Sequence, residues 1–448
     1  MLKTFNKGGI HIPEYKFTAG NPIVELPAPR EAVVTFSQHI GAIAVCCVKP
    51  GEHVERGQLI AKANGVVSAN VHTPISGTVK SIGKWKTAFG YPCDTVTIVA
   101  SDEDAAYDAI SIPTARTDEE VAALTAEDIK SIVADAGVVG LGGAAFPTKV
   151  KLTPPSGSNP ELLILNGAEC EPFLTNDHAL MVSCADEIIE GAGYIMRATG
   201  VKRAVIGIEN NKPDAVSCIK DRLKGNPAIS VVALETKYPQ GGEKQLIKAI
   251  IGREVPNGNL PVSVGVIVQN VGTAYAIYRA VRLREPLISR IMTVSGKNVK
   301  NPGNFRVFLG TPLKTVIDAA GGIPENTGKI IVGGPMMGRA LVSVDAPTIK
   351  GVSGIVIVPE EESRRMSEEP CIRCGACVEV CPMGLEPYLL MPLTENGEWD
   401  LLNRHGVKNC IECGCCAYSC PSSRPLLDFI RLGKFKVNEA VRRKNNQN

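Results

Sequence analysis

The sequence lacks the features that mark several large protein classes. No apolar run approaches the roughly 18 to 20 residues that cross a bilayer, and the best candidate, residues 260–271, is interrupted by Pro261, Gln269 and Asn270. Residues 1–16 have no apolar core of the kind found in a signal peptide. The net charge is only +2, so no field recruits nucleic acid or an anionic membrane. We therefore expect no membrane span and no nucleic-acid partner.

Histidine is also scarce, which argues against a histidine-based metal site. None of the six histidines stands at metal-ligand spacing, and we expect them to be surface or structural residues: His11, His39, His53, His72, His178 and His405. Cysteine, by contrast, occurs fifteen times. Several cysteines are scattered singly, as in Cys93, Cys170 and Cys218, which favours a reducing compartment over a disulfide framework.

Eight cysteines form two copies of one arrangement, Cys-x-x-Cys-x-x-Cys-x-x-x-Cys-Pro. The first copy contains Cys371, Cys374, Cys377 and Cys381, and the second contains Cys410, Cys413, Cys416 and Cys420. This spacing is typical of ferredoxins with two 4Fe-4S clusters, in which the fourth cysteine of each run binds the other cluster. It predicts one cluster on Cys371, Cys374, Cys377 and Cys420, and a second on Cys410, Cys413, Cys416 and Cys381.

A pair of structural zinc sites is the alternative interpretation of these cysteines. Zinc ribbons pair two Cys-x-x-Cys knuckles across a longer gap and do not need a third, evenly spaced cysteine. The repeated third cysteine therefore favours iron–sulfur clusters. Cys415 has no place in the pattern, and we expect it to be a spare thiol near a cluster.

Short β-strands broken by glycine and proline are expected from residue 38 to residue 99. The pieces VKPGEHVERGQLIA and HTPISGTV resemble the lipoyl and biotinyl domain, in which a hairpin lysine carries a swinging cofactor. The hairpin here, residues 64–68, has no lysine, and the nearby Lys62 is expected to be an exposed surface charge. The sequence thus predicts an unacylated barrel-sandwich scaffold over residues 1–110.

Residues 117–285 alternate between apolar runs and helical patterns. The runs LLILNG, AVIGIE, VVALE and GVIVQNV are typical of parallel strands buried on both faces. Leu180, Cys184, Ile188 and Ile195 share one face of an expected helix, and residues 212–223 form a second. We expect a parallel α/β sheet with its ligand beyond the carboxyl ends of the strands.

Two smaller units follow. Residues 290–345 hold the strand-like runs TVSGKNV and FRVFLG, a short helix from Leu313 and the turn-rich GGPMMG, which predicts a small α+β module. Residues 360–435 contain the cysteine motifs, and the tail from Lys434 is polar and expected to be frayed. The fold class expected is multidomain α/β.

The glycine-rich segment 137–151, GVVGLGGAAFPTKVK, is a candidate phosphate site, because glycines let backbone N–H groups approach a phosphate and a lysine can neutralise it. Polar groups also follow three expected strands: Asn166 to Pro172, Tyr238 to Lys244, and Asn270 to Thr273. The carboxyl ends of parallel strands share one edge, so these patches are expected to converge on one crevice.

Several segments resemble one family across nearly the whole chain: KGGIH at residues 7–11, GLGGAAFPTKVKL, LNGAECEPFLTNDHALM, QGGEKQLI, NVGTA, VSGKNVKNPG, GGPMMG and the paired cysteine motifs. The chain resembles the RnfC family, which supplies one subunit of the Rnf complex, and its middle is similar to the flavin subunit of respiratory complex I. The resemblance implies a Rossmann-like flavin and NADH domain, a soluble-ligand-binding β-grasp module at 290–345 serving as a contact surface, and an α-helical two-cluster ferredoxin domain.

That family couples electron flow between NADH and ferredoxin to Na⁺ or H⁺ translocation, so the resemblance implies non-covalent FMN, two 4Fe-4S clusters and NADH as substrate. It further implies a peripheral position on the cytoplasmic face of the cell membrane, with the other Rnf membrane and iron–sulfur subunits as partners and ferredoxin reached indirectly. A flavin between nicotinamide and cluster converts a hydride into single electrons. The coupling ion stays open.

The resemblance also assigns residues. Gly140, Gly142, Gly143 and Lys151 would hold the FMN phosphate region, and Asn166, Glu169, Glu171, Asn270 and Thr273 would surround the flavin and ribityl chain. Phe146 would stack on adenine, and Glu243, with Gly241 and Gly242 giving room, would receive the nicotinamide nucleotide. Ala145 stands where the family usually has glycine, and Ala168 and Gly242 stand where complex I flavin subunits carry acids.

Two rival functions remain open at this point. A soluble iron–sulfur flavoprotein, such as the corrin reductases, shares the flavin and cluster segments but has no membrane partner. A non-catalytic relay subunit would keep the clusters and hold only a vestigial nucleotide site. The KGGIH segment and the barrel-sandwich piece favour the Rnf-like function over the first rival, and Lys151 and Glu243 argue against the second.

Overall fold

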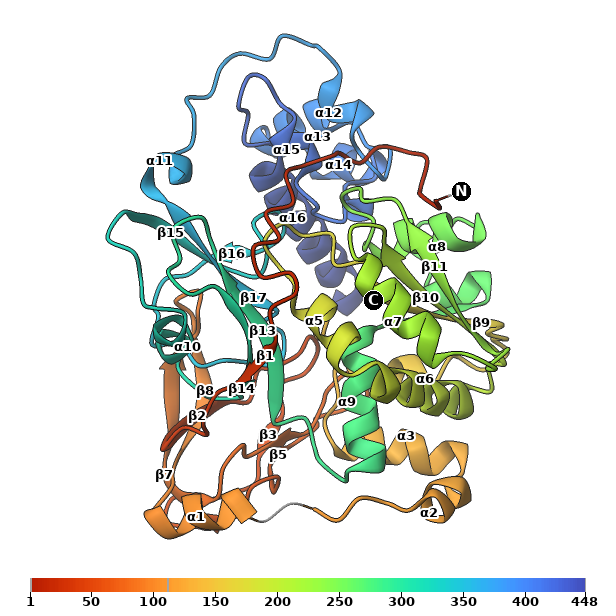
Figure 1. Ribbon diagram of the computed structural model, residues 1–448. Coiled ribbons are helices and arrows are strands. Elements are labelled where there is room, and N and C mark those ends of the chain that lie inside the picture. The colour runs from red at the N-terminus through yellow and green to blue at the C-terminus, as the bar shows by residue number, and fades with distance from the viewer. Residues whose placement is uncertain (1, 111–112, 448) are drawn as a thin grey trace.

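A computed structural model describes residues 2–110 and 113–447, arranged as four packed parts (Figure 1). The first part is a pair of small sheets. One has the strand order β2-β8-β7-β4 and the other β3-β5-β6. Their strands are β2 (Glu31–Thr35), β3 (Val45–Cys46), β4 (His53–Val54), β5 (Leu59–Lys62), β6 (Val71–His72), β7 (Gly77–Lys86) and β8 (Pro92–Val99). Val54, Ile60, Val71 and Ile98 fill one core between the sheets, in agreement with the expected barrel-sandwich architecture.

Helices occupy much of the acidic segment that follows. They are α1 (Asp102–Ile110), α2 (Asp118–Ala123), α3 (Ala126–Asp135) and, after the glycine-rich loop, α4 (Thr148–Leu152). Thr117 and Thr125 begin α2 and α3 with capping boxes, in which each threonine side chain accepts from a backbone N–H three residues on. Ile129 and Val133 of α3 are buried, so α3 covers part of the next core.

The central part is a four-stranded parallel sheet in the order β11-β10-β9-β12. Its strands are β9 (Leu162–Gly167), β10 (Arg203–Glu209), β11 (Ile229–Leu234) and β12 (Val266–Asn270), and these match the four apolar runs of the sequence. Leu163 and Leu165 pack in the core that helices α6 (Ala185–Thr199) and α9 (Val271–Arg282) cover, whereas Ile164 packs in the core that helix α8 (Glu243–Ile251) covers. Burial on both faces explains why the runs are continuously apolar.

The helices of this part are α5 (Asn176–Ser183), α6 (Ala185–Thr199), α7 (Pro213–Arg222), α8 (Glu243–Ile251) and α9 (Val271–Arg282), with a 3₁₀ turn at Pro261–Val264. The prediction of a single helix across Leu180 to Ile195 is wrong. The segment forms two helices, α5 and α6, which are separated at Cys184, whose φ of −132° is not helical. α5 packs mainly on α7 and also on β13, whereas α6 packs mainly along α9. The main packing partners of the two helices therefore differ.

The third part is a six-stranded mixed sheet in the order β1-β14-β13-β17-β15-β16. It contains β1 (Ile23–Glu25), β13 (Ser289–Ser295), β14 (Gly303–Phe308), β15 (Thr327–Val332), β16 (Arg339–Ala340) and β17 (Gly354–Pro359), with α10 (Leu313–Ala319) packed on it. The strand-like runs and the helix from Leu313 are confirmed. The sheet reaches beyond residues 290–345, because β17 lies inside it and β1 comes from the N-terminal segment.

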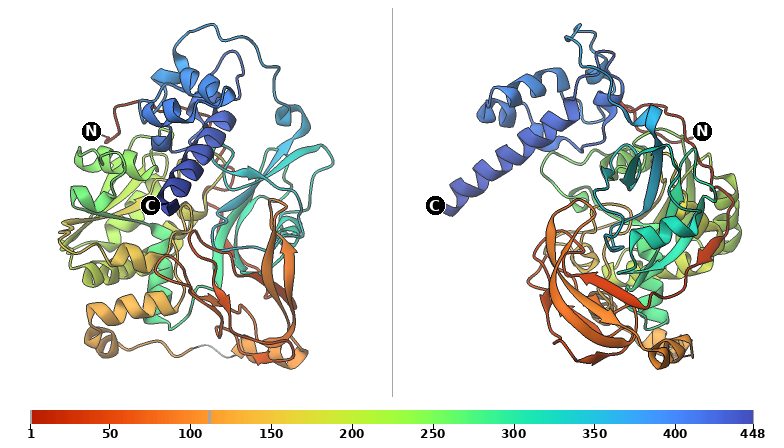
Figure 2. Two further views of the ribbon diagram at one scale, coloured as in Figure 1. Left: turned by 180° about the vertical axis from the view of Figure 1, so that it is seen from behind. Right: turned by 90° about the vertical axis from the view of Figure 1, so that its left-hand side faces the viewer.

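The last part contains the cysteine motifs and short helices: α11 (Glu360–Ser363), α12 (Ala376–Glu379), α13 (Pro387–Glu395), α14 (Trp399–Arg404), a 3₁₀ turn at Val407–Asn409, α15 (Cys415–Tyr418) and α16 (Leu426–Gln447). The prediction of a frayed tail from Lys434 is wrong, because α16 continues to Gln447 and extends away from the body (Figure 2). Val437 is buried in the core of this part, and Lys434 donates to Glu412 at 2.8 Å.

Candidate functional site

The crevice expected from the sequence corresponds to the carboxyl edge of β9 and β12, where the order of the parallel sheet reverses. The chain passes from β9 outward to β10 and β11 and then crosses to β12 on the other side of β9, and ligands of open α/β sheets bind beyond the strand ends at such a point. Asn166 and Asn270 end β9 and β12 and face each other in register. Asn166 Nδ2 donates to Gly241 O at 2.8 Å, and Asn270 Nδ2 donates to Asp177 Oδ2 at 2.6 Å. Two of the expected polar patches therefore meet here, with the third beside them.

The glycine-rich loop closes over these strand ends. Gly140 N–H donates to Phe146 O at 2.8 Å, and Leu141 N–H donates to the Thr273 hydroxyl at 3.0 Å. A Cβ at Gly142 would lie 2.5 Å from Asn270 Nδ2, so only glycine fits there without displacing the asparagine. Gly142 and Gly143 are exposed and Phe146 is half-buried. The loop thus presents bare backbone toward solvent at the crevice.

Ala145 sits in this loop with a φ of 53°, in the left-handed region that costs a residue with a Cβ about 1 kcal/mol. Its side chain is buried, so the apolar contact offsets part of the backbone strain.

Lys151 and Glu243 meet across the crevice. Lys151 Nζ lies 2.6 Å from Glu243 Oε1, with about a third of each side chain exposed at 33% and 40%. Glu243 is the first residue of α8, and Gly242 before it caps the helix without a side-chain hydrogen bond. The N-terminal N–H groups of α8 therefore lack a side-chain acceptor at this edge, which favours an anionic partner.

Two expected flavin contacts are placed differently by the structure. Glu169 accepts from the N–H groups of Asp177 and His178 at 2.7 and 3.2 Å, at the start of α5. Glu171 is buried and accepts from the N–H groups of Met336 and Met337 at 3.0 and 2.8 Å. Burial raises the pKa of Glu171 to about 7. Both carboxylates stabilise loops, because backbone N–H groups engage their oxygens.

Two lysines, the half-buried Lys16 and the buried Lys212, hold the loop after β9, and sequence reasoning missed both. Lys16 Nζ donates to the carbonyls of Glu169, Glu171 and Leu174 at 2.8, 2.9 and 2.7 Å. Lys212 Nζ donates to Ala168 O at 2.7 Å. Lys16 lies more than a hundred residues from its acceptors in sequence, and no local spacing signals such a contact.

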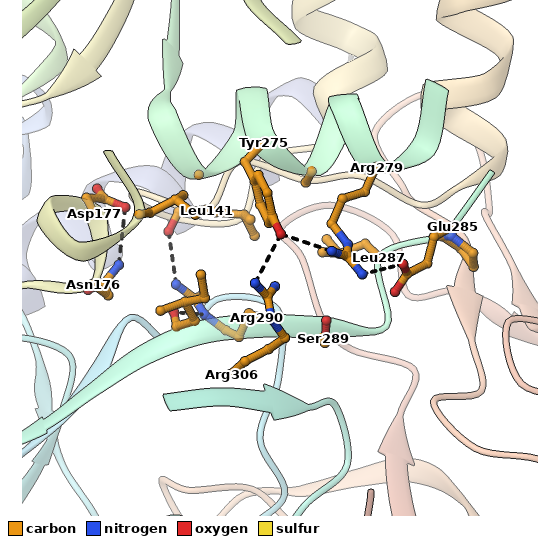
Figure 3. A pocket seen from close by; sticks show the side chains of 15 residues that line it. Leu141, Asn176, Asp177, Tyr275, Arg279, Glu285, Leu287, Ser289, Arg290 and Arg306 are labelled. Carbon is orange, nitrogen blue, oxygen red and sulfur yellow. Dashed lines mark hydrogen bonds and ion pairs between the residues drawn. The ribbon is translucent and has the colours of Figure 1, made fainter. Parts of the chain in front are cut away.

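A second cavity adjoins the glycine loop, between α9 and β13 (Figure 3). The Tyr275 hydroxyl accepts from Arg279 and Arg306 at 2.9 and 3.0 Å. Arg290 is buried and donates to the carbonyls of Leu141 and Lys350, while burial lowers its pKa to about 10. Arg290 thus braces the glycine loop at Leu141.

The cysteine motifs repeat in structure as well as in sequence. Arg373 and Glu412, at matching positions inside the two motifs, have φ of 57° and 59°, and Gly375 and Gly414 have φ of 79° and 82° before α12 and α15. These left-handed residues turn the chain sharply between successive cysteines, which keeps the thiols on one side of each loop.

One four-cysteine set lines a single pocket. Cys381 from the first motif lies there with Cys410, Cys413 and Cys416 from the second, which is the set expected for a crossed arrangement, and Cys415 also lines the pocket. In the other set, Cys371 and Cys374 are exposed. The pKa of Cys377 is raised, mainly because the thiol is partly buried and to a smaller extent because Cys420 and Cys371 lie nearby. Among the described residues, no three cysteine, histidine or acidic side chains are grouped so that they could hold a single metal ion.

Cys415 packs in an apolar core beside these thiols. Its side chain is fully buried and packs with Cys413, Ile10 and Tyr238. It therefore belongs to the contact between the cysteine motifs and the parallel-sheet part.

Comparison with protein families divides the chain in the same way. The matches are a RnfC barrel sandwich hybrid domain at residues 3–104, a Nuo51 FMN-binding domain at 133–279, an SLBB domain at 291–340 and a 4Fe-4S binding domain at 366–385. The crevice residues from Gly140 to Thr273 all fall within the FMN-binding match. Within the described ranges, no helix combines the length and apolarity required to span a membrane.

Curated relatives extend over nearly the whole chain. The C subunit of the proton-translocating ferredoxin:NAD(+) oxidoreductase complex of Clostridium ljungdahlii is 44% identical, covering 90% of this chain and 86% of the relative. The C subunit of the Na(+)-translocating complex of Acetobacterium woodii is 42% identical over 98% of both chains. The C subunit of the ion-translocating oxidoreductase complex of Rhodobacter capsulatus is 41% identical over 99% of this chain and 85% of the relative. The chain therefore belongs to the family of C subunits of ion-translocating ferredoxin:NAD(+) oxidoreductase complexes, the RnfC family.

Proposed function

We propose that this chain is the peripheral electron-input subunit of an Rnf complex, passing electrons between NADH, FMN and two 4Fe-4S clusters. The observation that carries the proposal is the crevice at the β9–β12 reversal, in a chain that also brings Cys381, Cys410, Cys413 and Cys416 into one pocket. A nucleotide site and a cluster site in one polypeptide provide the two ends of such an electron path.

The chemistry of the crevice residues suits FMN. Gly142 lets the Asn270 side chain pack against the glycine loop, the loop backbone is exposed, and Lys151 supplies a cation. We assign the phosphate region to Gly140, Gly142, Gly143 and Lys151, and the flavin and ribityl chain to Asn166, Asn270 and Thr273. Glu169 and Glu171 serve this site by holding its loops, since backbone N–H groups engage their carboxylates.

NADH is assigned to the outer side of the same crevice. Phe146, half-buried at the loop, offers a ring to adenine, and Gly241, Gly242 and Glu243 receive the nicotinamide nucleotide. When bound, FMN accepts a hydride and releases electrons singly. The task of the protein residues is to orient the nucleotide, to neutralise its phosphate and to exclude water from the buried face of the crevice.

The clusters are assigned in the crossed arrangement. Cys410, Cys413, Cys416 and Cys381 hold one cluster, and Cys371, Cys374, Cys377 and Cys420 hold the other. The common pocket of the first set supports this pairing. Thiolate ligation of this kind suits a one-electron carrier.

The remaining parts are assigned supporting roles. Residues 1–110 form an unacylated barrel-sandwich scaffold, 117–285 a Rossmann-like FMN and NADH domain, 290–345 the main part of a β-grasp contact module, and 360–435 a two-cluster ferredoxin domain. We place the subunit on the cytoplasmic face of the membrane, held there by the other Rnf subunits, with ferredoxin reached through them. The named relatives differ between H⁺ and Na⁺, so no coupling ion is assigned.

The proposal is tested by anaerobic titration of the cluster-reconstituted protein with NADH in the presence of FMN, following flavin and cluster absorbance together. Bleaching of both chromophores is the expected result. A flavin that does not bind, or that binds and does not respond to NADH, would reduce the chain to a relay subunit. Co-purification with membrane subunits separates the Rnf assignment from a soluble flavoprotein reductase.

A further inference from the structure

Tyr238 lies between the nucleotide crevice and the cluster pocket. It comes after β11, three residues before Gly241, and its side chain is 2% exposed. Its hydroxyl donates to the backbone carbonyl of Cys413 at 2.8 Å. The ring packs in a small apolar core with Ile10, Cys413 and Cys415. One side chain thus joins a crevice loop to the segment that carries a cluster ligand.

Cys170 links the same core to the other crevice loop. It stands between Glu169 and Glu171 in the loop after β9, and its Sγ accepts from Gly241 N–H at 3.3 Å. Cys170 packs against the core that contains Tyr238 and Cys413. The loops after β9 and β11 are therefore fixed to each other at the point where Tyr238 meets the cysteine motif.

The N-terminal segment KGGIH reinforces this contact. Ile10 and Tyr238 exchange two backbone hydrogen bonds of 2.8 and 2.9 Å, and Gly9 N–H donates to Val380 O at 2.9 Å. Gly8 has a φ of 66°, and a Cβ there would lie 2.5 Å from the carbonyl carbon of Cys381. The segment passes between the crevice loop and the cysteine motif, so it touches both sides of the same joint.

From this geometry we propose that Tyr238 is a positioning residue that holds the Cys413 pocket at a fixed spacing from the nucleotide crevice. The inference rests on the proposed function, because the spacing matters only if electrons pass between the two sites. Reactions between positioned groups are sensitive to distance, and a misplacement of about 1 Å can cost roughly a hundredfold in rate. The hydroxyl is the only part of Tyr238 that donates a hydrogen bond to the cysteine motif in the described chain.

The test uses Tyr238→Phe in the full-length, cluster-reconstituted protein, with Tyr194→Phe as the matched control. Tyr194 is similarly buried, but its hydroxyl donates to Glu190 on α6, away from the crevice. Electron paramagnetic resonance of the dithionite-reduced protein should show a changed signal for one cluster only, and a redox titration followed by the same signal should show a changed midpoint potential for that cluster. This readout requires neither FMN nor NADH.

Stopped-flow mixing with NADH supplies the second readout. Flavin bleaching should keep its rate and its dependence on NADH, whereas cluster bleaching should slow by roughly tenfold or more. Gly8→Ala, which crowds the Cys381 backbone from the other side of the joint, should produce the same separation. If the clusters of Tyr238→Phe bleach at the wild-type rate, the proposal is overturned, even if the resonance signal has changed.

The two proposals fail in different ways. If wild-type flavin does not respond to NADH, the proposed function fails and the resonance signals alone decide the role of Tyr238. In that case, unchanged signals of both clusters in Tyr238→Phe overturn it, and a change confined to one cluster supports it.

Discussion

Lys151 and Glu243, 92 residues apart in sequence, form an ion pair of 2.6 Å across the crevice. The lysine comes from α4, directly after the glycine loop, and the glutamate begins α8. The proposed phosphate-binding cation and the proposed nicotinamide-site acid are therefore ion-pair partners. A phosphate bound by Lys151 would compete with Glu243 and so would couple the two halves of the proposed site.

Removing either partner should separate the two binding functions. Lys151→Met should weaken FMN binding about tenfold or more, since a charge-assisted contact contributes roughly 1.5 to 3 kcal/mol. Glu243→Gln should leave FMN binding equal or tighter, because Lys151 loses its competitor, and should raise the KM for NADH. Fluorescence titration with FMN and steady-state kinetics measure the two effects. Lys149→Met, an exposed lysine of the same helix, is the control, and equal losses in all three variants would contradict the assignment.

The glycine loop offers a sharp pair of substitutions. Gly142→Ala should lower FMN affinity about tenfold or more, because its Cβ would lie 2.5 Å from Asn270 Nδ2 and push that side chain out of the crevice. A Cβ at Gly143 meets no atom within 4 Å, so Gly143→Ala should fold and should lower FMN affinity less than Gly142→Ala does, because the contact assigned to Gly143 is made by its backbone. Equilibrium dialysis with FMN checks both, and a greater loss in Gly143→Ala would show that the backbone approach assigned to Gly142 is wrong.

The crossed cluster arrangement predicts an iron count. Cys381 and Cys410 come from different motifs but line one pocket, so the double variant Cys381→Ser/Cys410→Ser should lose one cluster and keep the other, leaving about four of about eight iron atoms. Iron and sulfide analysis after anaerobic reconstitution measures this. Cys377→Ser/Cys410→Ser is the matched control and should lose both clusters. Loss of all iron in the first variant would favour a pairing within each motif.

A cysteine substitution should also separate flavin reduction from electron transfer to the clusters. Cys377→Ala should abolish electron exit through the clusters while NADH still bleaches the flavin, because Cys377 lies in the cysteine motifs and not in the crevice. Rapid-scan absorbance under anaerobic conditions follows both chromophores. Loss of flavin bleaching in a folded variant would contradict the division between the nucleotide site and the cluster domain.

Lys350 predicts a pH-dependent stability. It is fully buried at a junction of three parts, where its Nζ donates to the carbonyls of Asn70 and Gly137 at 2.7 Å each. Burial lowers its pKa from 10.5 to about 7. Between these values the unfolded chain binds a proton that the folded chain does not, so the free energy of unfolding should rise with pH across this window and stay flat below it.

Lys350→Met should remove that rise. The full change is about 5 kcal/mol, at about 1.36 kcal/mol for each pKa unit, and chemical denaturation near pH 7 and near pH 10 measures it. A neutral amine keeps two N–H donors, so the wild-type contacts survive deprotonation. If wild type and variant show the same pH slope, Lys350 is not the titrating group.

Much of the parallel sheet was predictable from sequence alone, because strands buried on both faces must be continuously apolar. The strand-end asparagines Asn166 and Asn270 follow from the same pattern, since the carboxyl ends of parallel strands share one edge. The helix break at Cys184 was not predictable in this way. The apolar periodicity continues through the break, and the break is visible only in the tertiary structure, where α5 packs mainly on α7 whereas α6 packs mainly on α9.

The spacing of the cysteines also predicted which of them bind each cluster, and the resemblance of several sequence segments to the RnfC family predicted the family. Only the tertiary structure revealed contacts between distant segments. Lys16 donates hydrogen bonds to the loop after β9, Glu171 accepts from the backbone N–H groups of Met336 and Met337, and the Tyr238 hydroxyl donates to the Cys413 carbonyl. Local patterns record periodic burial and turn chemistry, which a short window of sequence contains. Partners that lie more than a hundred residues apart are chosen by how the parts pack, and no window of sequence contains both.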